Sequence, residues 1–252
     1  NKNYADSAPS TIDEILDYAD NYEATDATEK VENIFKWNVA DIFSNFFFIS
    51  NYVNLGGETG DDPTQVSLDA QEVKDCLAYY QSLNAFFVTT DNVLQEFIDG
   101  KTVYTIAKTD AIAQIDAAAD SYFYGIAEVP NLTDELSTKG LSVTNSVVVN
   151  AYSKERDTAK EFARFLTYDK ADELYAMSNK MPVRLGVSYE NPEMSVLLDQ
   201  YENSVEVPKL TDLSNYWIEM EIVFANIWKG NDVNTEVDSV TRKIMSQLQA
   251  TE

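Results

Sequence analysis

The chain has 252 residues, which is long enough to bury a sizeable core as one large domain or as two smaller ones. It carries 43 Asp and Glu residues against 18 Lys and Arg residues, a formal net charge of -25 at pH 7. Such an acidic surface repels phosphate backbones and anionic membranes, so no nucleic acid is expected as a partner; the surface either only solvates the protein or favours a cationic ligand. The absence of histidine removes triad hydrolases and zinc sites built on histidine.

The single cysteine and the lengths of the apolar runs argue against a disulfide, a reactive thiol and a membrane span. Cys76 is the only cysteine, so no internal disulfide forms, and its neighbours Val73, Leu77 and Tyr80 share a helical face with it. We therefore predict a small buried hydrophobe and not a reactive thiol. No run approaches the roughly 20 apolar residues of a membrane span. Residues 1–6 lack the features of a signal peptide, so the signal of an exported protein would have been removed.

The first half of the chain alternates predicted helices and strands. Thr11 and Glu14 have capping-box spacing and predict a helix that ends near Asn21, followed by a loop over 23–30. A strand is predicted over 31–37. The aromatic segment 41–52 is too long and continuous for a strand, so we predict a largely buried helix that stops before Gly56 and Gly57.

Helices and strands are also predicted from residue 69 onward. Asp69 or Ser67 can cap a helix that extends to about Ala85. The remaining predictions before residue 142 are a short helix over 91–99 that Gly100 terminates, a strand over 102–107, a helix from Thr109 or Asp110 to Ala119, and a strand over 124–129. The chain closes with predicted helices over 192–202, 213–229 and 233–248, the last with Val233, Val237, Val240, Ile244 and Leu248 on one stripe.

The stretch 145–182 changes its hydrophobic period in the middle. Val147–Val149 is a β-branched run typical of a buried strand. After a polar turn, apolar residues recur at helical spacing. These residues are Ala159, Phe162, Ala163 and Leu166. A second helix is predicted around Leu174 to Met177, and Pro182 ends it. Strands alternate with helices along the whole chain, which indicates a helix-rich α/β fold.

Several segments, in this order, resemble the maltose-binding-protein-like solute-binding proteins of ATP-driven importers. The segments are PSTIDEILDYADNY, FIDGKTVYTI, the stretch 145–182 and WKGNDVNTEVDSVTRKIMSQL. The resemblance implies a type II periplasmic-binding fold in which 1–142 and 190–252 form a complete second lobe. Residues 143–189 would then be an incomplete piece of the first lobe. Because family members are longer at the N-terminus, the chain resembles a C-terminal fragment with one cleft wall, and we expect it to bind ligand weakly or not at all.

The resemblance also implies ligand-binding residues, since the family stacks sugar rings on aromatic side chains. An ungapped match from Gly56 and Gly57 places the acidic and aromatic contacts on Ser44, Phe46 and Phe47. A slip of two or three residues places them on Asp41 and Phe43 instead. Core packing is the alternative role for each Phe.

Other candidates lie further along the chain. Trp217 stands where the family has a tryptophan that faces the cleft, and Glu221 follows one helical turn later, where the maltose binder has a basic residue. Asp110 could accept a hydrogen bond from a sugar hydroxyl or an amine, or it could only cap a helix. Asn145, with Thr144 and Ser146, lies at the lobe crossing and could reach ligand or act as a hinge.

These patterns favour a substrate-binding receptor for a sugar or oligosaccharide importer, with a membrane permease as partner and no cofactor or metal. The expected location is extracellular, anchored to the outer face of the cell membrane, or periplasmic. A receptor for a cationic solute, such as an amino sugar or a polyamine, is the alternative within this class. A glycosidase needs two carboxylates about 5 to 10 Å apart, and the sequence singles out no such pair. An interaction module with aromatic contact patches also remains open.

Overall fold

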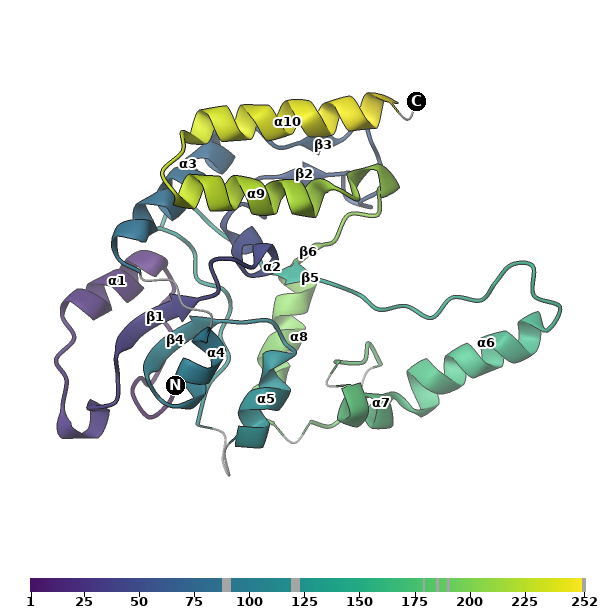
Figure 1. Cartoon of the computed structure of the whole chain (residues 1–252). Helices are drawn as coiled ribbons and strands as arrows, with labels where there is room; N and C mark the ends of the chain where they lie inside the picture. The colour runs from purple at the N-terminus through teal and green to yellow at the C-terminus, as the bar shows by residue number, and fades with distance from the viewer. Residues whose placement is uncertain (88–91, 119–122, 179, 185, 190, 251–252) are drawn as a thin grey trace.

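The computed structural model describes residues 1–87, 92–118, 123–178, 180–184, 186–189 and 191–250. Helices dominate it (Figure 1). The helices are α1 (Ile12–Asp20), α2 (Ile42–Asn45), α3 (Gln71–Ser82), α4 (Val93–Ile98), α5 (Ala111–Ala118), α6 (Arg156–Arg164), α7 (Ala171–Ser178), α8 (Met194–Asn203), α9 (Tyr216–Trp228) and α10 (Val233–Ala250). Single turns of 3₁₀ helix lie at Asp26–Thr28, Phe46–Phe48, Leu83–Ala85 and Thr211–Leu213, and a π-helical turn at Phe165–Asp169 follows α6.

Short strands form three small sheets within the described residues. The strands are β1 (Asn33–Trp37), β2 (Asn54–Leu55), β3 (Val66–Ser67), β4 (Thr102–Ile106), β5 (Leu141–Ser142) and β6 (Val205–Glu206). The parallel pair β1 and β4 is central, with Phe35 opposite Tyr104 and Trp37 opposite Ile106. The pair β2 and β3 is antiparallel, and the pair β5 and β6 is parallel. A parallel pair requires a crossover connection, and α2, α3 and α4 lie within it.

A continuous aromatic core joins the sheet to the helices above it. Trp37 of β1 lies 5.9 Å from Phe48 and 5.9 Å from Trp228, measured between ring centroids. Tyr80 of α3 lies 5.0 Å from Phe224 of α9. The buried indole Nε1 of Trp37 donates to Asn45 Oδ1 at 2.8 Å, which satisfies the one polar atom that this ring carries into the core.

Several sequence predictions are confirmed. Thr11 and Glu14 form the reciprocal capping box of α1, with Glu14 N donating to Thr11 Oγ1 at 3.1 Å and Thr11 N donating to Glu14 Oε2 at 3.3 Å. Gly100 has a φ of 77°, as expected after α4. The apolar stripe of α10, from Val233 to Leu248, is buried. Cys76 is also fully buried, and burial raises the pKa of its thiol to about 12.

Two predictions about helices are wrong in extent. The aromatic segment predicted as one helix over 41–52 forms α2 and a 3₁₀ turn, and Ile49 already lies beyond them. The residue before α3 is Ala70, and neither Asp69 nor Ser67 caps this helix. The predicted start of one helix at Asp91 and the predicted end of another at Ala119 lie outside the described residues. Within the described residues, α4 and α5 match these two predicted helices.

Two predicted strands are absent from the described residues. Val147–Val149 has no strand partner, and Val148 is 86% exposed, because a β-branched run becomes a strand only where a neighbouring strand supplies hydrogen bonds. The described segment 124–129 is extended but unpaired, since side chains and not a sheet hold its backbone. Ile126 N, for example, donates to Glu193 Oε2 at 3.0 Å.

Residues 143–189 stand apart from the main body. Figure 1 shows α6 and α7 away from the other helices, joined to them by the long extended chain after β5. The described residues form two hydrophobic cores, the large aromatic one and a small one around Phe97, Ile115 and Tyr124, and neither includes any described residue of this stretch. The helices predicted here are present, but Phe162 on the apolar face of α6 is 59% exposed. None of the described helices has the length and hydropathy needed to cross a membrane.

Candidate functional site

Three aromatic rings meet where α2 approaches the start of α9. The Trp217 ring lies 5.0 Å from the Phe43 ring and 5.1 Å from the Phe46 ring, measured between centroids. Phe46 is fully buried, Trp217 is half-buried, and Phe43 is 43% exposed. The inner ring thus fixes Trp217 from below, while Phe43 and part of Trp217 face outward. Such an arrangement offers an apolar ring surface to a ligand.

Asp41 lies at the edge of these aromatic rings and is fixed by three donors. As the residue before α2, its carboxylate accepts from Phe43 N at 2.9 Å and from Ser44 Oγ at 3.3 Å. Lys108 Nζ lies 2.9 Å from Asp41 Oδ2. These bonds orient both polar groups beside the exposed Phe43 ring, where carboxylate and ammonium can bind the hydroxyls of a ligand.

The protonation states of this pair follow from their contacts. Burial acts to raise the pKa of Asp41, but hydrogen bonds from Lys108, Phe43 N and Ser44 together hold that pKa below its usual range. The hydrogen bond to Asp41 raises the pKa of Lys108 above its ordinary value, against a smaller opposing effect of burial. At neutral pH the site therefore presents a carboxylate and an ammonium in contact.

The site lies at the carboxyl end of the central sheet. Asp41 follows β1 by four residues, and Lys108 follows β4 by two. Because β1 and β4 are parallel, their carboxyl ends meet at the same edge. In open α/β sheets ligands bind outside this edge, because the loops there bring side chains from separate strands together. The topology therefore explains why residues far apart in sequence converge here.

The structure distributes the sequence-predicted residues unevenly. Asp41, Ser44, Phe46 and Trp217 lie within this cluster, together with Phe43 from the slipped match. Ser44 is buried and contributes mainly through its bond to Asp41. Phe47 instead packs in the core, where its ring lies 4.3 Å from that of Phe48 and it is only 3% exposed.

The other three candidates are exposed. Asp110 precedes α5 and lies close enough to Lys108 to affect its pKa. Glu221 is exposed on α9, one helical turn beyond Trp217. Asn145 lies in the extended chain after β5, and its neighbour Thr144 shares a hydrogen bond of 2.9 Å with the Tyr201 hydroxyl of α8.

Sequence reasoning missed Lys108. A usable signal was present, because Lys108 comes directly after one predicted strand and Asp41 comes four residues after the predicted strand before it. Only the parallel pairing of the two strands shows that these positions are neighbours. No group of three or more Cys, Asp or Glu side chains that could hold a metal ion occurs in the described part of the chain.

Solved structures share this fold over essentially the whole chain. The maltose-binding periplasmic protein MalE from Listeria monocytogenes, solved with maltose, is 19% identical and aligns with a TM-score of 0.77 over 100% of this chain and 70% of its own. The extracellular solute-binding protein from Staphylococcus aureus, also solved with maltose, gives 18% identity and a TM-score of 0.80 over 100% and 68%. The maltotriose-binding protein of Thermus thermophilus gives 19% and 0.70 over 100% and 68%.

These similarities define the class as a helix-rich α/β fold of the type II periplasmic-binding kind. The sequence matches the family described as bacterial extracellular solute-binding protein over residues 1–202. The chain belongs to this family. A search of curated protein sequences finds no match. The family and the similar structures are described as solute-binding proteins.

Proposed function

We propose that the chain is the ligand-recognising part of a substrate-binding receptor for an ATP-driven sugar or oligosaccharide importer. In this proposal two lobes close on the sugar, and the closed form delivers it to a permease in the cell membrane. The receptor is extracellular and anchored to the outer face of that membrane, or it is periplasmic. The supporting observation is the exposed stacking surface of Phe43 and Trp217 beside the Asp41 and Lys108 pair. Rings bind the apolar face of a sugar, and the charged pair binds its hydroxyls.

The domain organisation is part of the proposal. Residues 1–142 and 190–252 form the second lobe, and 143–189 belongs to the first. This division is supported by the two hydrophobic cores, which lie outside 143–189 among the described residues. It is also supported by exposed apolar side chains on that stretch, which a first lobe would cover. Among them are Val148, Tyr152, Phe162 and Met177.

A titration of the 252-residue chain tests the aromatic surface. Maltotriose, glucosamine and spermidine are added to high millimolar concentration, and tryptophan fluorescence and heat are measured. Because the chain supplies one wall of the cleft, we expect maltotriose to bind only weakly. Trp217→Ala should weaken this affinity about tenfold or more, because an aromatic stacking contact contributes roughly 1 kcal/mol beyond its buried area. Phe86→Ala is the matched control, since this ring is 60% exposed and lies outside the site.

The outcomes separate the alternatives. Equal affinity in the wild type and in Trp217→Ala, with both folded by circular dichroism, would remove the aromatic surface from the site. Binding of glucosamine or spermidine in preference to maltotriose would favour a cationic solute, which the exposed acids Asp110 and Glu221 would suit. In Lys108→Met the apolar stem stays and the donor is lost, so we expect a several-fold weaker sugar affinity, with a loss of stability below about 1 kcal/mol because the Lys108 side chain of the ion pair with Asp41 is half-exposed.

A further inference from the structure

Two isoleucines lie exposed on the solvent face of α9. Ile218 is 59% exposed and Ile222 is 49% exposed. They are four residues apart, so their side chains are neighbours on one side of the helix. The adjacent helix α10 differs, because its exposed side chains, among those that the structure describes, are all polar. The solvent face of α9 is therefore unusually apolar for this part of the molecule.

Folding does not account for this pair. A β-branched side chain loses rotational freedom in a helix, and a side chain left in water gains little hydrophobic stabilisation in return. Glu, Gln or Lys at either position would favour the helix more. Adjacent apolar side chains on a surface commonly mark a contact with another molecule, so the pair indicates a binding role.

The core and α10 cover two sides of α9. Glu219 forms an ion pair with Lys243 of α10, and Asn226 Nδ2 donates to Glu236 Oε2 of the same helix at 3.1 Å. The residues buried in the core are Tyr216, Met220, Val223, Phe224 and Ile227.

The aromatic rings of the candidate site lie on a third side. The Trp217 ring packs against Phe43 at 5.0 Å between centroids. A helix turns by about 100° per residue, so Ile218 lies beside Trp217 around the helix, and Ile222 follows one turn later. The exposed carboxylate of Glu221 comes between them on the helix surface. The isoleucines thus extend the outward surface of the aromatic rings away from the central sheet.

The size of this surface indicates what it binds. A stable protein interface buries roughly 800 Å² on each partner, far more than two partly exposed isoleucines can offer. Exposed polar residues also border the pair, with Ser214 on one side and Lys229 on the other. A small apolar group matches the area, and continuity with the aromatic rings places that group on a ligand that already rests on Trp217.

We propose that Ile218 and Ile222 form a subsite for an apolar substituent of the sugar ligand, which makes that ligand a glycoside with an alkyl or aryl group. The sugar ring stacks on Phe43 and Trp217, and Glu221 accepts from a hydroxyl where the sugar meets the substituent. The substituent leaves water against the two isoleucines. This inference rests on the proposed sugar site and adds the class of glycoside to it.

Two maltosides that differ only in the aglycone test the subsite. Methyl maltoside and octyl maltoside, the latter below its micelle concentration, are titrated into the 252-residue chain, and isoleucine methyl signals are followed by NMR. We expect octyl maltoside to bind about tenfold more tightly or more, because its chain removes apolar surface from water. It should also shift the Ile222 methyl signals, which methyl maltoside should leave in place. Equal affinities would overturn the subsite and leave the sugar site standing.

Polar substitution of the pair tests the location. The double variant Ile218→Gln with Ile222→Gln places good helix formers at two exposed positions, so the fold should be kept. We expect it to abolish most of the preference for octyl maltoside, while the affinity for methyl maltoside changes by less than about twofold. A preference that persists in full would place the octyl chain elsewhere and overturn the proposal.

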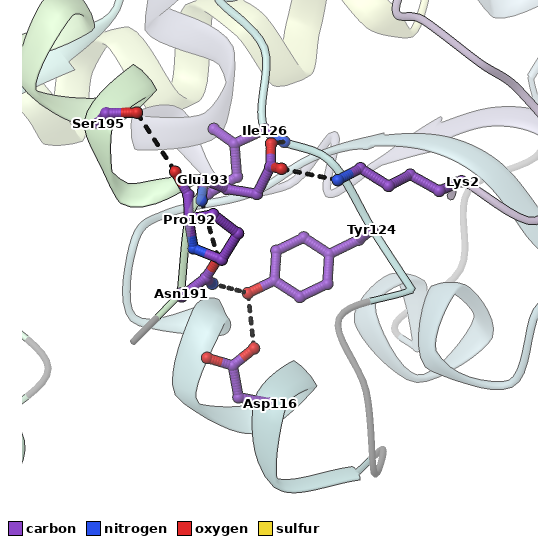
Figure 2. A network of polar contacts seen from close by, with 8 residues as sticks. All are labelled: Lys2, Asp116, Tyr124, Ile126, Asn191, Pro192, Glu193 and Ser195. Atoms are coloured by element: carbon purple, nitrogen blue, oxygen red, sulfur yellow. Dashed lines mark hydrogen bonds and ion pairs between the residues drawn. The ribbon is translucent and has the colours of Figure 1, made fainter. Parts of the chain in front are cut away.

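Leu198→Gln on α8 is the matched control. Leu198 is 42% exposed and lies on another helix of the same body. Figure 2 shows how the chain leading into α8 is anchored, with Asn191 Nδ2 donating to the Tyr124 hydroxyl at 2.6 Å and Glu193 paired with Lys2 at 2.6 Å. The octyl preference should be unchanged in this variant. A loss equal to that of the double variant would show that octyl chains bind exposed apolar side chains in general, which contradicts the subsite.

Trp217→Ala separates this inference from the proposed function. It should weaken both maltosides by a similar factor, because the sugar stacks on the ring in each. An octyl maltoside affinity that does not change in Trp217→Ala would overturn the subsite, and binding of neither maltoside to the wild type would overturn the sugar site with it. The sugar-free amphiphile octyl tetraethylene glycol should bind at least tenfold more weakly than octyl maltoside. Equal binding of these two would contradict a glycoside as the ligand.

Discussion

At the scale of single residues, neighbours decide what each polar group does. Asp41 stays charged because Lys108, Phe43 N and Ser44 donate to it, and it thereby orients both members of the pair beside the aromatic rings. Tyr124, by contrast, has a structural task, since its hydroxyl links α5 to the residues before α8. The same residue types on the exposed surface would be free to move. Chemical identity alone therefore does not separate a binding group from a scaffold group.

For the 252-residue chain prepared with a free amine on Asn1, burial of that amine predicts a pH dependence of stability. Its pKa falls from an ordinary value of 8.0 to about 6 on folding, so between these values the unfolded chain binds a proton that the folded chain has released. Unfolding then takes up a proton, and the free energy of unfolding should rise by about 2 kcal/mol from pH 6 to pH 8. The stability is fully present above pH 8 and is lost as pH falls through 6. Urea denaturation at several pH values measures it.

No histidine side chain contributes to the change in stability between pH 6 and pH 8, because the chain has no histidine. An N-terminally acetylated chain is the control, and its stability should be nearly flat between pH 6 and pH 8. The same slope in both chains would show that the Asn1 amine is not the responsible group.

At the scale of elements, periodicity predicted helices well and isolated strands poorly. Helical hydrogen bonds are local, so the capping box at Thr11 and the stripe of α10 were sufficient to place α1 and α10. A strand needs a partner that the sequence does not specify, which explains why β4 formed and Val147–Val149 did not. The prediction of one helix over the aromatic segment 41–52 was wrong for another reason. The hydrophobicity of this segment reflects its burial and does not specify a single continuous helix.

The contact between α3 and α9 buries a hydroxyl that has no hydrogen-bond partner. Tyr80 is fully buried in the aromatic core, and its hydroxyl has no hydrogen-bond partner. Removing an unsatisfied buried polar atom recovers its desolvation cost, so Tyr80→Phe should stabilise the chain by about 1 kcal/mol. Differential scanning calorimetry measures the change as a higher Tm.

Tyr79→Phe is the matched control on the same helix. The Tyr79 hydroxyl donates to Asp13 Oδ1 at 2.7 Å, so its removal should leave Tm unchanged or lower it slightly. A lower Tm in Tyr80→Phe would mean that this hydroxyl has a partner in solution, such as a buried water.

At the scale of the whole molecule, one compact body carries a stretch that packs little against it. The larger core gathers residues from both ends of the chain, whereas α6 and α7 stand to one side (Figure 1). The solved structures cover this chain almost completely, while the chain spans 68 to 70% of the lengths of MalE and the Staphylococcus aureus protein. The proposed assignment of 143–189 to a first lobe follows from this separation.

Limited proteolysis tests that assignment. Because the backbone of 143–189 has few buried apolar contacts, it should open locally far more readily than the body. Trypsin should therefore cut first at Lys154, Arg156, Lys160 or Arg164. Mass spectrometry of the first products gives the sites. Lys74 and Lys229, at the ends of core helices, are the internal controls, and first cleavage there would contradict the separation.

The sequence by itself determined most of the helices, the burial of Cys76, the α/β class and the resemblance to solute-binding proteins, because each depends on local spacing or on composition. Only the tertiary structure decided which aromatic residues form a surface, since it buried Phe47 and left Phe43 exposed beside Trp217. It also joined Lys108 to Asp41. Pairing of distant strands sets all of these, and no local pattern in the chain encodes which strands become neighbours.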